Sequence, residues 1–566
     1  MKFSEMKYER MDVAAICAKC AELTDGLKRA DTFAKAEAAF LEYDRLHAHI
    51  DTMCTIAYIR HTINTEDKFY SDESDFIDES TPLLEEPKMN WALALTSSPF
   101  RPDFEKKYGE LFLKDMEMDL KTFRPEIVPD LQEENKLVSE YVKLYASAQV
   151  PFEGGTYTIS QLAPYREDAD DARRRAAWDA DGNWWLEHGD EFDRNYDELV
   201  RVRTKMARKL GYEDYTQLGY YRMTRNSYDR RDVEKFRDAV VKYIVPVADR
   251  LYREKAKRTG VPYPLSYADV NPMFRSGNAK PCGTPEEILA HAREFYHELS
   301  PETSEFIDAM FDGEMMDVLS RKGKMAGGYE TEIRDYKCPF IFANFNGTSD
   351  DVETMTHEAG HAFASYTARD FVPEATQSPT LDACEIHSMS MEFFAWPWEE
   401  GFFGGETLKF KYSHLAGALE FIPYGCLVDH FQHEIYAAPD MTPAERHETW
   451  KRLVARYMPW LRLGEVPFYG DGRYWQRQLH IYESPFYYID YCLAQTVALE
   501  FWAAMQQDRQ DAWRRYYDLV KLGGRRNFTG LVQAAKLPVP FEEDALATVS
   551  AAAVKWLDSV DMSGIE

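Results

Sequence analysis

Apolar residues recur at three- and four-residue steps along most of this 566-residue chain. This spacing follows the 3.6-residue period of the α-helix, so it predicts a mainly α-helical protein. The pattern is clearest over residues 10–60, 130–150, 172–210, 232–258, 284–312, 405–437, 491–520 and 541–557. Hydrophobic residues make up 45% of the chain, which is enough for a large buried core and argues against disorder.

One segment breaks the helical pattern. Residues 326–347 read AGGYETEIRDYKCPFIFANFNG and are rich in β-branched and aromatic side chains. Such residues favour extended chain, so we expect one or two strands beside a glycine-containing loop. The fold predicted from the sequence is therefore mainly α, with one small β-sheet next to the motif that follows.

Charge and the N-terminal residues bound the partners and the location. The formal net charge is −30, which argues against nucleic-acid binding. The N-terminus, MKFSEMKYERMDV, has no apolar core of a signal peptide, and no run of about 18 apolar residues predicts a membrane span. The eight cysteines are scattered, so we expect reduced thiols and a cytoplasmic protein.

The pattern H-E-x-x-H occurs within residues 350–366, DDVETMTHEAGHAFASY. Four residues turn an α-helix by about 400°, so His357 and His361 project from one face and can bind one tetrahedral ion. Glu358 lies about 100° around the helix, beside the open coordination position, where a carboxylate can take a proton from metal-bound water. We therefore predict one Zn²⁺ ion held by the two histidines, with Glu358 as the catalytic base. The alternative is a pair of solvent-facing histidines.

Two local features bear on this helix. Asp350 and Glu353 predict a start resembling a capping box. Gly360 costs about 1 kcal/mol relative to alanine inside a helix, and it leaves room for another backbone to approach closely.

Zinc needs a third protein ligand, and a second helix can supply it. The Gly-x-x-His continuation of the metzincins is absent after His361, which excludes that class. Residues 378–396, SPTLDACEIHSMSMEFFAW, predict a return helix that Ser378 caps. Glu385 on this helix is the predicted third ligand; the alternative is a surface glutamate. Asp382 and Glu392 share its face, and either could hold a zinc-bound histidine or be structural.

A second cluster of candidate residues lies in 474–496, YWQRQLHIYESPFYYIDYCLAQT. Peptide hydrolysis needs hydrogen-bond donors aimed at the oxyanion that forms on the cleaved carbonyl, and tyrosine hydroxyls or a histidine can serve. Tyr488 and Tyr491 are three residues apart and share a helix face, with His480 nearby in the sequence. The alternative is an aromatic stripe that belongs to the core.

These residues together resemble a known family. The run PFIFANFNGTSDDVETMTHEAGHAF, the Glu385 helix and HIYESPFYYIDYCLAQ are similar to the oligoendopeptidase F and thimet oligopeptidase family of zinc peptidases, and most of all to its oligoendopeptidase F-like branch with the Pz-peptidases. The N-terminal stretch IRHTINTEDKFYSDESDFIDES fits too, so the resemblance covers nearly the whole chain.

The resemblance implies a large helical fold that encloses a deep channel, with zinc inside and short unstructured peptides as substrates. It implies that His357, His361 and Glu385 are ligands, that Glu358 is the base, and that Tyr488, with His480 or Tyr491, binds substrate and stabilises the oxyanion. The strand at 338–345 would border the channel, where a free edge could pair with the peptide main chain; the alternative is a buried structural strand. For the domains we expect an N-terminal helical lobe, 1–200, and a catalytic helical lobe, 201–566.

Two other functions remain open from the sequence. A carboxypeptidase or dipeptidyl carboxypeptidase could use the same architecture, because ligand spacing does not separate these enzymes from an endopeptidase. A non-catalytic zinc or peptide-binding protein is the second alternative. The presence of Glu358 argues against it, since a structural site rarely leaves a coordination position open beside a carboxylate.

Overall fold

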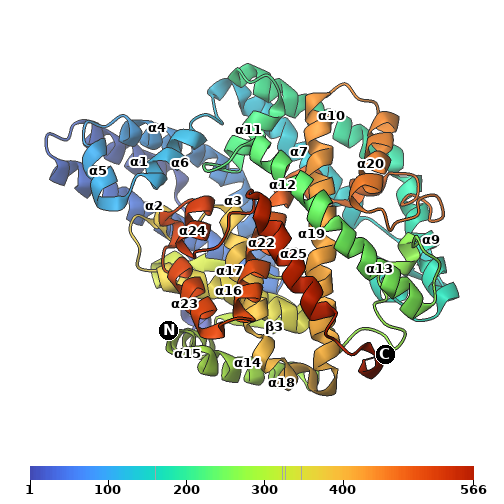
Figure 1. Cartoon of the computed structure of the whole chain (residues 1–566). Helices are drawn as coiled ribbons and strands as arrows, with labels where there is room; N and C mark the ends of the chain where they lie inside the picture. The colour runs from blue at the N-terminus through green and yellow to red at the C-terminus, as the bar shows by residue number, and fades with distance from the viewer. Residues whose placement is uncertain (160, 322, 326, 346, 566) are drawn as a thin grey trace. The chain divides into compact units, whose positions relative to one another are not determined.

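Helices dominate the computed structural model, which describes residues 1–566 apart from 160, 322, 326, 346 and 566. Two of these exceptions, 326 and 346, fall in the predicted strand region and so lie outside the described residues. The mainly helical fold is confirmed (Figure 1). The predicted helix at 491–520 is in fact two helices, because the chain turns between Met505 and Arg509.

The chain forms two compact units, each assembled from three separated segments. The first comprises Met1–Leu120, Ala279–Thr407 and Ala504–Leu537, and the second comprises Lys121–Asn278, Leu408–Ala503 and Pro538–Glu566. The lobes expected at 1–200 and 201–566 therefore do not coincide with these units and stay a prediction.

The first unit contains most of the residues of the candidate site. Its elements are α1 (Val13–Lys28), α2 (Phe33–Ile63), α3 (Lys68–Ser80), α4 (Glu85–Thr96), α5 (Arg101–Tyr108), α6 (Leu111–Asp119), α14 (Pro285–Leu299), α15 (Pro301–Asp312), β3 (Met316–Leu319), β4 (Tyr329–Ile333), β5 (Cys338–Phe345), α16 (Asp350–Ala368), α17 (Leu381–Phe394), α18 (Glu399–Phe403), α23 (Arg509–Val520) and α24 (Phe528–Ala534). A core of aromatic and aliphatic residues, among them Phe40, Trp91 and Phe104, joins α1, α2, α4 and α5.

The second unit is also helical. Its elements are α7 (Val128–Ala146), β1 (Val150–Phe152), β2 (Gly155–Tyr157), α8 (Ala163–Arg166), α9 (Asp171–Glu187), α10 (Gly189–Leu210), α11 (Tyr215–Arg222), α12 (Arg230–Tyr243), α13 (Val245–Thr259), α19 (Thr407–Ala437), α20 (Pro443–Tyr457), α21 (Leu479–Glu483), α22 (Tyr488–Met505) and α25 (Glu543–Leu557). Among the described residues, no helix is long and apolar enough to cross a membrane.

The predicted sheet has three strands in the order β3-β5-β4. Strand β5 pairs in parallel with β3 and antiparallel with β4, so both of its sides are hydrogen-bonded. The expectation that 338–345 offers a free edge is therefore wrong. Its nearly continuous burial from Pro339 to Ala343 is typical of a strand inside a sheet. The strands at the two edges of the sheet are β3 and β4.

A second, two-stranded sheet was not predicted. Strands β1 and β2 pair antiparallel around Glu153 and Gly154, whose φ angles are +47° and +78°. Two consecutive positive φ angles are typical of a type I′ hairpin turn, in which glycine is favoured. The expected helix at 130–150 accordingly ends at Ala146.

Both helices of the candidate site begin differently from the prediction. Helix α16 begins at Asp350, but its N-cap residue, Ser349, makes no side-chain capping bond, so the capping box is wrong. Three carboxylates in the first turn, from Asp350, Asp351 and Glu353, suit the positive end of the helix dipole instead. Helix α17 begins at Leu381 after Thr380, and Ser378 does not cap it, because its hydroxyl donates to Glu332 at 2.7 Å.

Gly360 brings α16 and α17 into direct backbone contact. A Cβ atom at this position would lie 2.7 Å from both the carbonyl oxygen of His387 and the Cα of Ser388. Such a distance is too short for any side chain, so only glycine allows this approach. The close approach inferred from the sequence is confirmed, and it holds the face of α16 that carries His361 against α17.

Candidate metal centre

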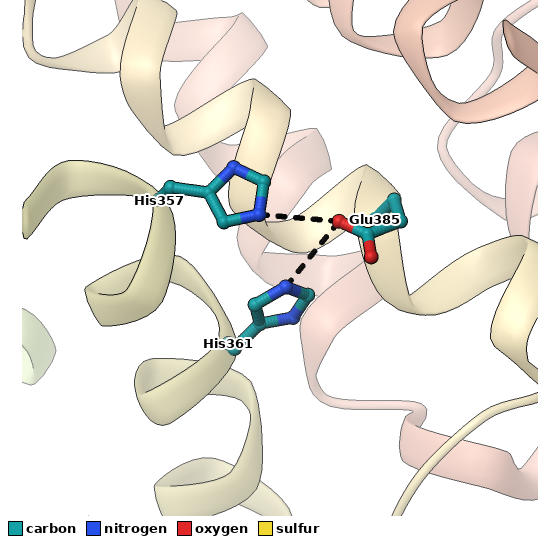
Figure 2. A group of neighbouring side chains, drawn as sticks. All are labelled: His357, His361 and Glu385. Atoms are coloured by element: carbon teal, nitrogen blue, oxygen red, sulfur yellow. Dashed lines mark ion pairs between the residues drawn. The ribbon is translucent and has the colours of Figure 1, made fainter. Parts of the chain in front are cut away.

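Three side chains from α16 and α17 converge on one point. The Nε2 atoms of His357 and His361 lie 3.2 Å and 3.4 Å from the same carboxylate oxygen, Oε2 of Glu385 (Figure 2). One ligand atom from each residue lies within 4.8 Å of the others. The structure thus brings together the three residues that the sequence predicts as ligands.

These distances fit a tetrahedral metal ion. Zinc binds histidine nitrogen and carboxylate oxygen at about 2.0–2.2 Å, which places neighbouring ligand atoms of a tetrahedron about 3.3 Å apart. The two nitrogen–oxygen distances, 3.2 Å and 3.4 Å, lie on either side of this value. Two imidazoles and one carboxylate are also a common ligand set of catalytic zinc, so the residues fit the ion.

The charges at the centre favour an ionised Glu385. Burial alone would raise the pKa of this carboxyl, but hydrogen bonds from His357 and His361 hold it well below its usual range. Ser388 donates a further hydrogen bond to Oε2 of Glu385 at 2.9 Å. Ser388 is not among the residues predicted from the sequence, although its position three residues after Glu385 on the same helix is a usable signal.

A second carboxylate holds the ring of His357. Oε1 of Glu392 lies 2.7 Å from Nδ1 of His357 and leaves Nε2 facing Glu385. A histidine ligand commonly donates its other N–H to a carboxylate, which fixes the ring and its tautomer. Of the two acidic residues that the sequence offered for this position, the structure places Glu392 on the histidine; Asp382 is fully buried, and its Oδ1 accepts from Thr380 at 2.5 Å.

Glu358 is buried beside the same centre. Only 8% of the residue is exposed, and a Cβ placed on Gly328, directly before β4, would lie 3.6 Å from its Oε1. Burial raises the pKa of the Glu358 carboxyl, while His357 and His361 act in the opposite direction. A carboxylate with a raised pKa is suited to accept a proton at neutral pH.

His480, Tyr488 and Tyr491 form a cluster of their own in the second unit. The ring centre of His480 lies 4.9 Å from that of Tyr488 and 5.7 Å from that of Tyr491, and the two tyrosine rings are 5.6 Å apart. Nδ1 of His480 lies 2.8 Å from Nε2 of Gln478. Burial lowers the pKa of His480 to about 4 and raises that of Tyr488 well above its usual value, so both side chains are neutral at pH 7.

The fold and the ligand set define the class of protein: a helical metallopeptidase. The family profile named Peptidase M3 N-terminal domain matches residues 3–123, and the profile named Peptidase family M3 matches residues 293–550. The chain belongs to peptidase family M3.

Two solved structures have the same fold over 99% of this chain. A structure of PZ peptidase A with an inhibitor is 44% identical, with a TM-score of 0.93, and the match covers 99% of this chain and 100% of that one. An X-ray structure provisionally named oligoendopeptidase F is 47% identical, with a TM-score of 0.93 and 99% of both chains covered.

Among curated relatives, the chromosomal oligoendopeptidase F of Lactococcus lactis subsp. cremoris is 32% identical over 129 residues, which is 23% of this chain and 19% of that protein. An oligoendopeptidase F homolog of Borreliella burgdorferi is 26% identical over 233 residues and is matched over 38% of its length. The chain thus aligns with less than half of the length of either curated relative.

Proposed function

We propose that this peptidase is a zinc-dependent endopeptidase that hydrolyses internal bonds of short, unstructured peptides. The observation that carries the proposal is the pair of nearly equal distances from Oε2 of Glu385 to the imidazoles of His357 and His361, beside the buried Glu358. His357, His361 and Glu385 would hold one Zn²⁺ ion. When bound, such an ion lowers the pKa of a water molecule and polarises a carbonyl group.

The protein's own groups then move the proton. Glu358 removes a proton from the attacking water and delivers it to the nitrogen of the leaving amine. Its raised pKa supports both transfers, because burial makes the carboxylate a stronger proton acceptor than an exposed one. Glu392 keeps the ring of His357 in place throughout.

We propose that Tyr488, with His480 or Tyr491, donates hydrogen bonds to the developing oxyanion, as the family resemblance implies. The packing of the three rings against one another supports a shared role, since each limits the movement of the other two. A tyrosine whose pKa is raised by burial keeps its O–H proton and remains a donor.

The edge strand β4, rather than β5, is the proposed partner for the peptide main chain. It begins at Tyr329, directly after Gly328, which borders Glu358. Pairing along an edge strand fixes the register of a peptide without reading its side chains, which suits broad specificity. The eight free cysteines suit a reducing compartment, and we keep the cytoplasm as the proposed location.

One experiment tests the function and its main alternative together. A peptide library and a peptide blocked at both ends are digested, and the products are identified by mass spectrometry. We expect internal cleavage, loss of activity on treatment with a chelator, and recovery with Zn²⁺. Cleavage only at free C-termini would favour a carboxypeptidase, and no cleavage at all would favour a binding protein.

The base is tested by Glu358→Gln. We expect this variant to bind zinc as the wild type does and to lose nearly all turnover, because the amide cannot accept the proton. Retention of substantial activity would refute the assignment.

A further inference from the structure

A cavity of about 230 Å³ lies beside the metal centre, within the first unit. His361 forms part of its wall. Figure 2 shows the ring of the same residue directed toward Glu385. Helices α2, α16 and α17 and strand β4 supply most of the wall, and the segment before α17 supplies Gln377, Ser378 and Pro379. At about 30 Å³ per molecule in liquid water, the cavity has room for several waters or for one long side chain.

Two polar atoms in the wall of this cavity have no hydrogen-bond partner among the described residues. One is Oε1 of Glu330, and the other is Nε2 of His387. His387 is only 2% exposed, so bulk water does not satisfy its ring. Because a buried polar atom without a partner costs about 1–3 kcal/mol, such atoms in a cavity indicate a polar occupant.

The charged groups of the wall favour a positive occupant. Asp51, Glu330 and Glu332 are acidic, and Arg334 is basic. The guanidinium of Arg334 is already paired with Asp51 at 3.0 Å, with Glu332 at 2.7 Å and with Glu374 at 2.7 Å. Its charge is therefore already balanced, and burial beside Glu332 raises the pKa of Glu330 well above its usual value, so a bound cation would favour the ionised form of Glu330.

The surroundings of Glu332 differ from those of Glu330. Oε1 of Glu332 accepts from Ser378 at 2.7 Å, and Oε2 faces Arg334. A second metal ion does not suit the cavity, because the three-ligand group found in the described part of the chain is His357, His361 and Glu385. An organic cation with N–H donors matches a carboxylate oxygen and an imidazole nitrogen.

We propose that this cavity binds the lysine or arginine side chain of a substrate residue that flanks the cleaved bond, and that Glu330 is the residue that selects it. The inference rests on the proposed peptidase function, because the wall shared with His361 places the cavity next to the cleaved bond. The cationic group supplies a counter-charge for Glu330.

The test uses peptides blocked at both ends that differ at one position flanking the cleaved bond, on each side in turn. That position carries lysine, acetyl-lysine or norleucine, which keep a similar chain length with and without the charge. We expect kcat/KM for the lysine peptide to exceed that for the other two by about 10-fold or more at one of the two positions, as for a charge-assisted hydrogen bond. A ratio near 1 on both sides would overturn the proposal, and this comparison needs no change in the protein.

Glu330→Gln and Glu332→Gln are the matched variants, since both lie on the same face of β4 and both lose one carboxylate. We expect Glu330→Gln to abolish the lysine preference while cleavage of the norleucine peptide changes by less than about 3-fold. Glu332→Gln should keep the preference. If Glu330→Gln keeps it, or if Glu332→Gln removes it equally, Glu330 does not select the side chain. If the norleucine peptide is cleaved without any lysine preference, only this inference fails; if no peptide is cleaved, the proposed function fails.

Discussion

The contact between Glu392 and His357 shows how one side chain outside the ligand set controls the centre. Oε1 of Glu392 lies 2.7 Å from Nδ1 of His357 and fixes which ring nitrogen faces Glu385. Loss of such a carboxylate commonly weakens metal binding by about 10–100-fold. We expect Glu392→Ala to weaken zinc affinity by a factor in this range, measured by competition with a chelator of known affinity.

Glu448→Ala is the control for this prediction, because Glu448 is acidic, 71% exposed and paired with Lys451 on its own helix, α20. Its zinc affinity should equal that of the wild type. Equal affinity of Glu392→Ala and the wild type would mean that Glu392 does not hold the ring.

Gly360 also controls the metal centre without being a ligand, because it sets how closely the backbones of α16 and α17 pack. In Gly360→Ala the new methyl group would meet the carbonyl oxygen of His387 and the Cα of Ser388, both at 2.7 Å, and neither can move without shifting α17. Overpacking of this kind costs about 1–3 kcal/mol, which opposes the gain of about 1 kcal/mol in helix propensity. We expect a lower free energy of unfolding and weaker zinc binding, because Glu385 moves with α17.

Gly417→Ala is the matched control, since Gly417 also lies inside a helix, α19, and an added Cβ meets nothing within 4 Å. This variant should be as stable as the wild type or more stable by up to about 1 kcal/mol. Denaturant unfolding of both variants checks the pair. If the two substitutions changed the free energy of unfolding equally, the close contact at Gly360 would not limit the side chain at that position.

At the scale of elements, a buried ion pair fixes the start of α22. Arg225 donates to Oδ1 of Asp490 at 2.6 Å and to the carbonyl oxygen of Phe486, and both charged side chains are fully buried. Phe486 has a φ angle of +70°, which is unusual for a large side chain and has to be held by its surroundings. The pair therefore positions the turn that leads directly into Tyr488.

Removal of Arg225 should destabilise the fold, because the carboxylate of Asp490 is buried with it. We expect Arg225→Met to lower the free energy of unfolding by about 3–5 kcal/mol, because Asp490 is left buried without its cation. The double variant Arg225→Met with Asp490→Leu should recover most of that loss. Denaturant unfolding measures both; a double variant that is no more stable than the single one would contradict this account.

What the sequence could predict depends on how local each feature is. The spacing of His357 and His361 and the glycine between them are local to one helix, so the sequence was enough to place them. Glu385 required only the return of the chain to the first helix. The partners of a strand are set by segments far apart, and four-residue β3 carries too little pattern to be recognised. For this reason the sequence predicts a free edge at β5, whereas β5 is the central strand and β4 lies at an edge.

The start of a helix is equally hard to predict, because several polar residues compete for one capping position. Ser378 lies near the start of α17, but its hydroxyl donates a hydrogen bond to Glu332 on β4. No local sequence pattern predicts this contact. The sequence likewise cannot predict that Oε1 of Glu330 lacks a hydrogen-bond partner, because the cavity forms only when α2, β4, α16 and α17 come together.

At the scale of the whole molecule, buried ionisable groups make stability depend on pH in two opposing directions. Burial, with nearby arginines, lowers the pKa of His430 to about 3, whereas an unfolded histidine titrates near 6.5. Between these values the unfolded chain binds a proton that the folded chain does not, so His430 lowers stability as pH falls. Burial raises the pKa of the carboxyl groups of Glu420 and Glu500, which has the opposite effect.

A comparison with His430→Asn separates the histidine from these carboxyl groups, which both proteins share. Asparagine is neutral at every pH and can still bond the hydroxyl of Tyr457, which lies 2.9 Å from Nδ1 of His430. We expect the free energy of unfolding of the wild type to fall more steeply than that of the variant between pH 6.5 and 5, by about 1 kcal/mol per pH unit. Denaturant unfolding at three pH values gives both slopes. Parallel slopes would mean that His430 titrates alike in the folded and unfolded chains, and that its burial does not keep it neutral.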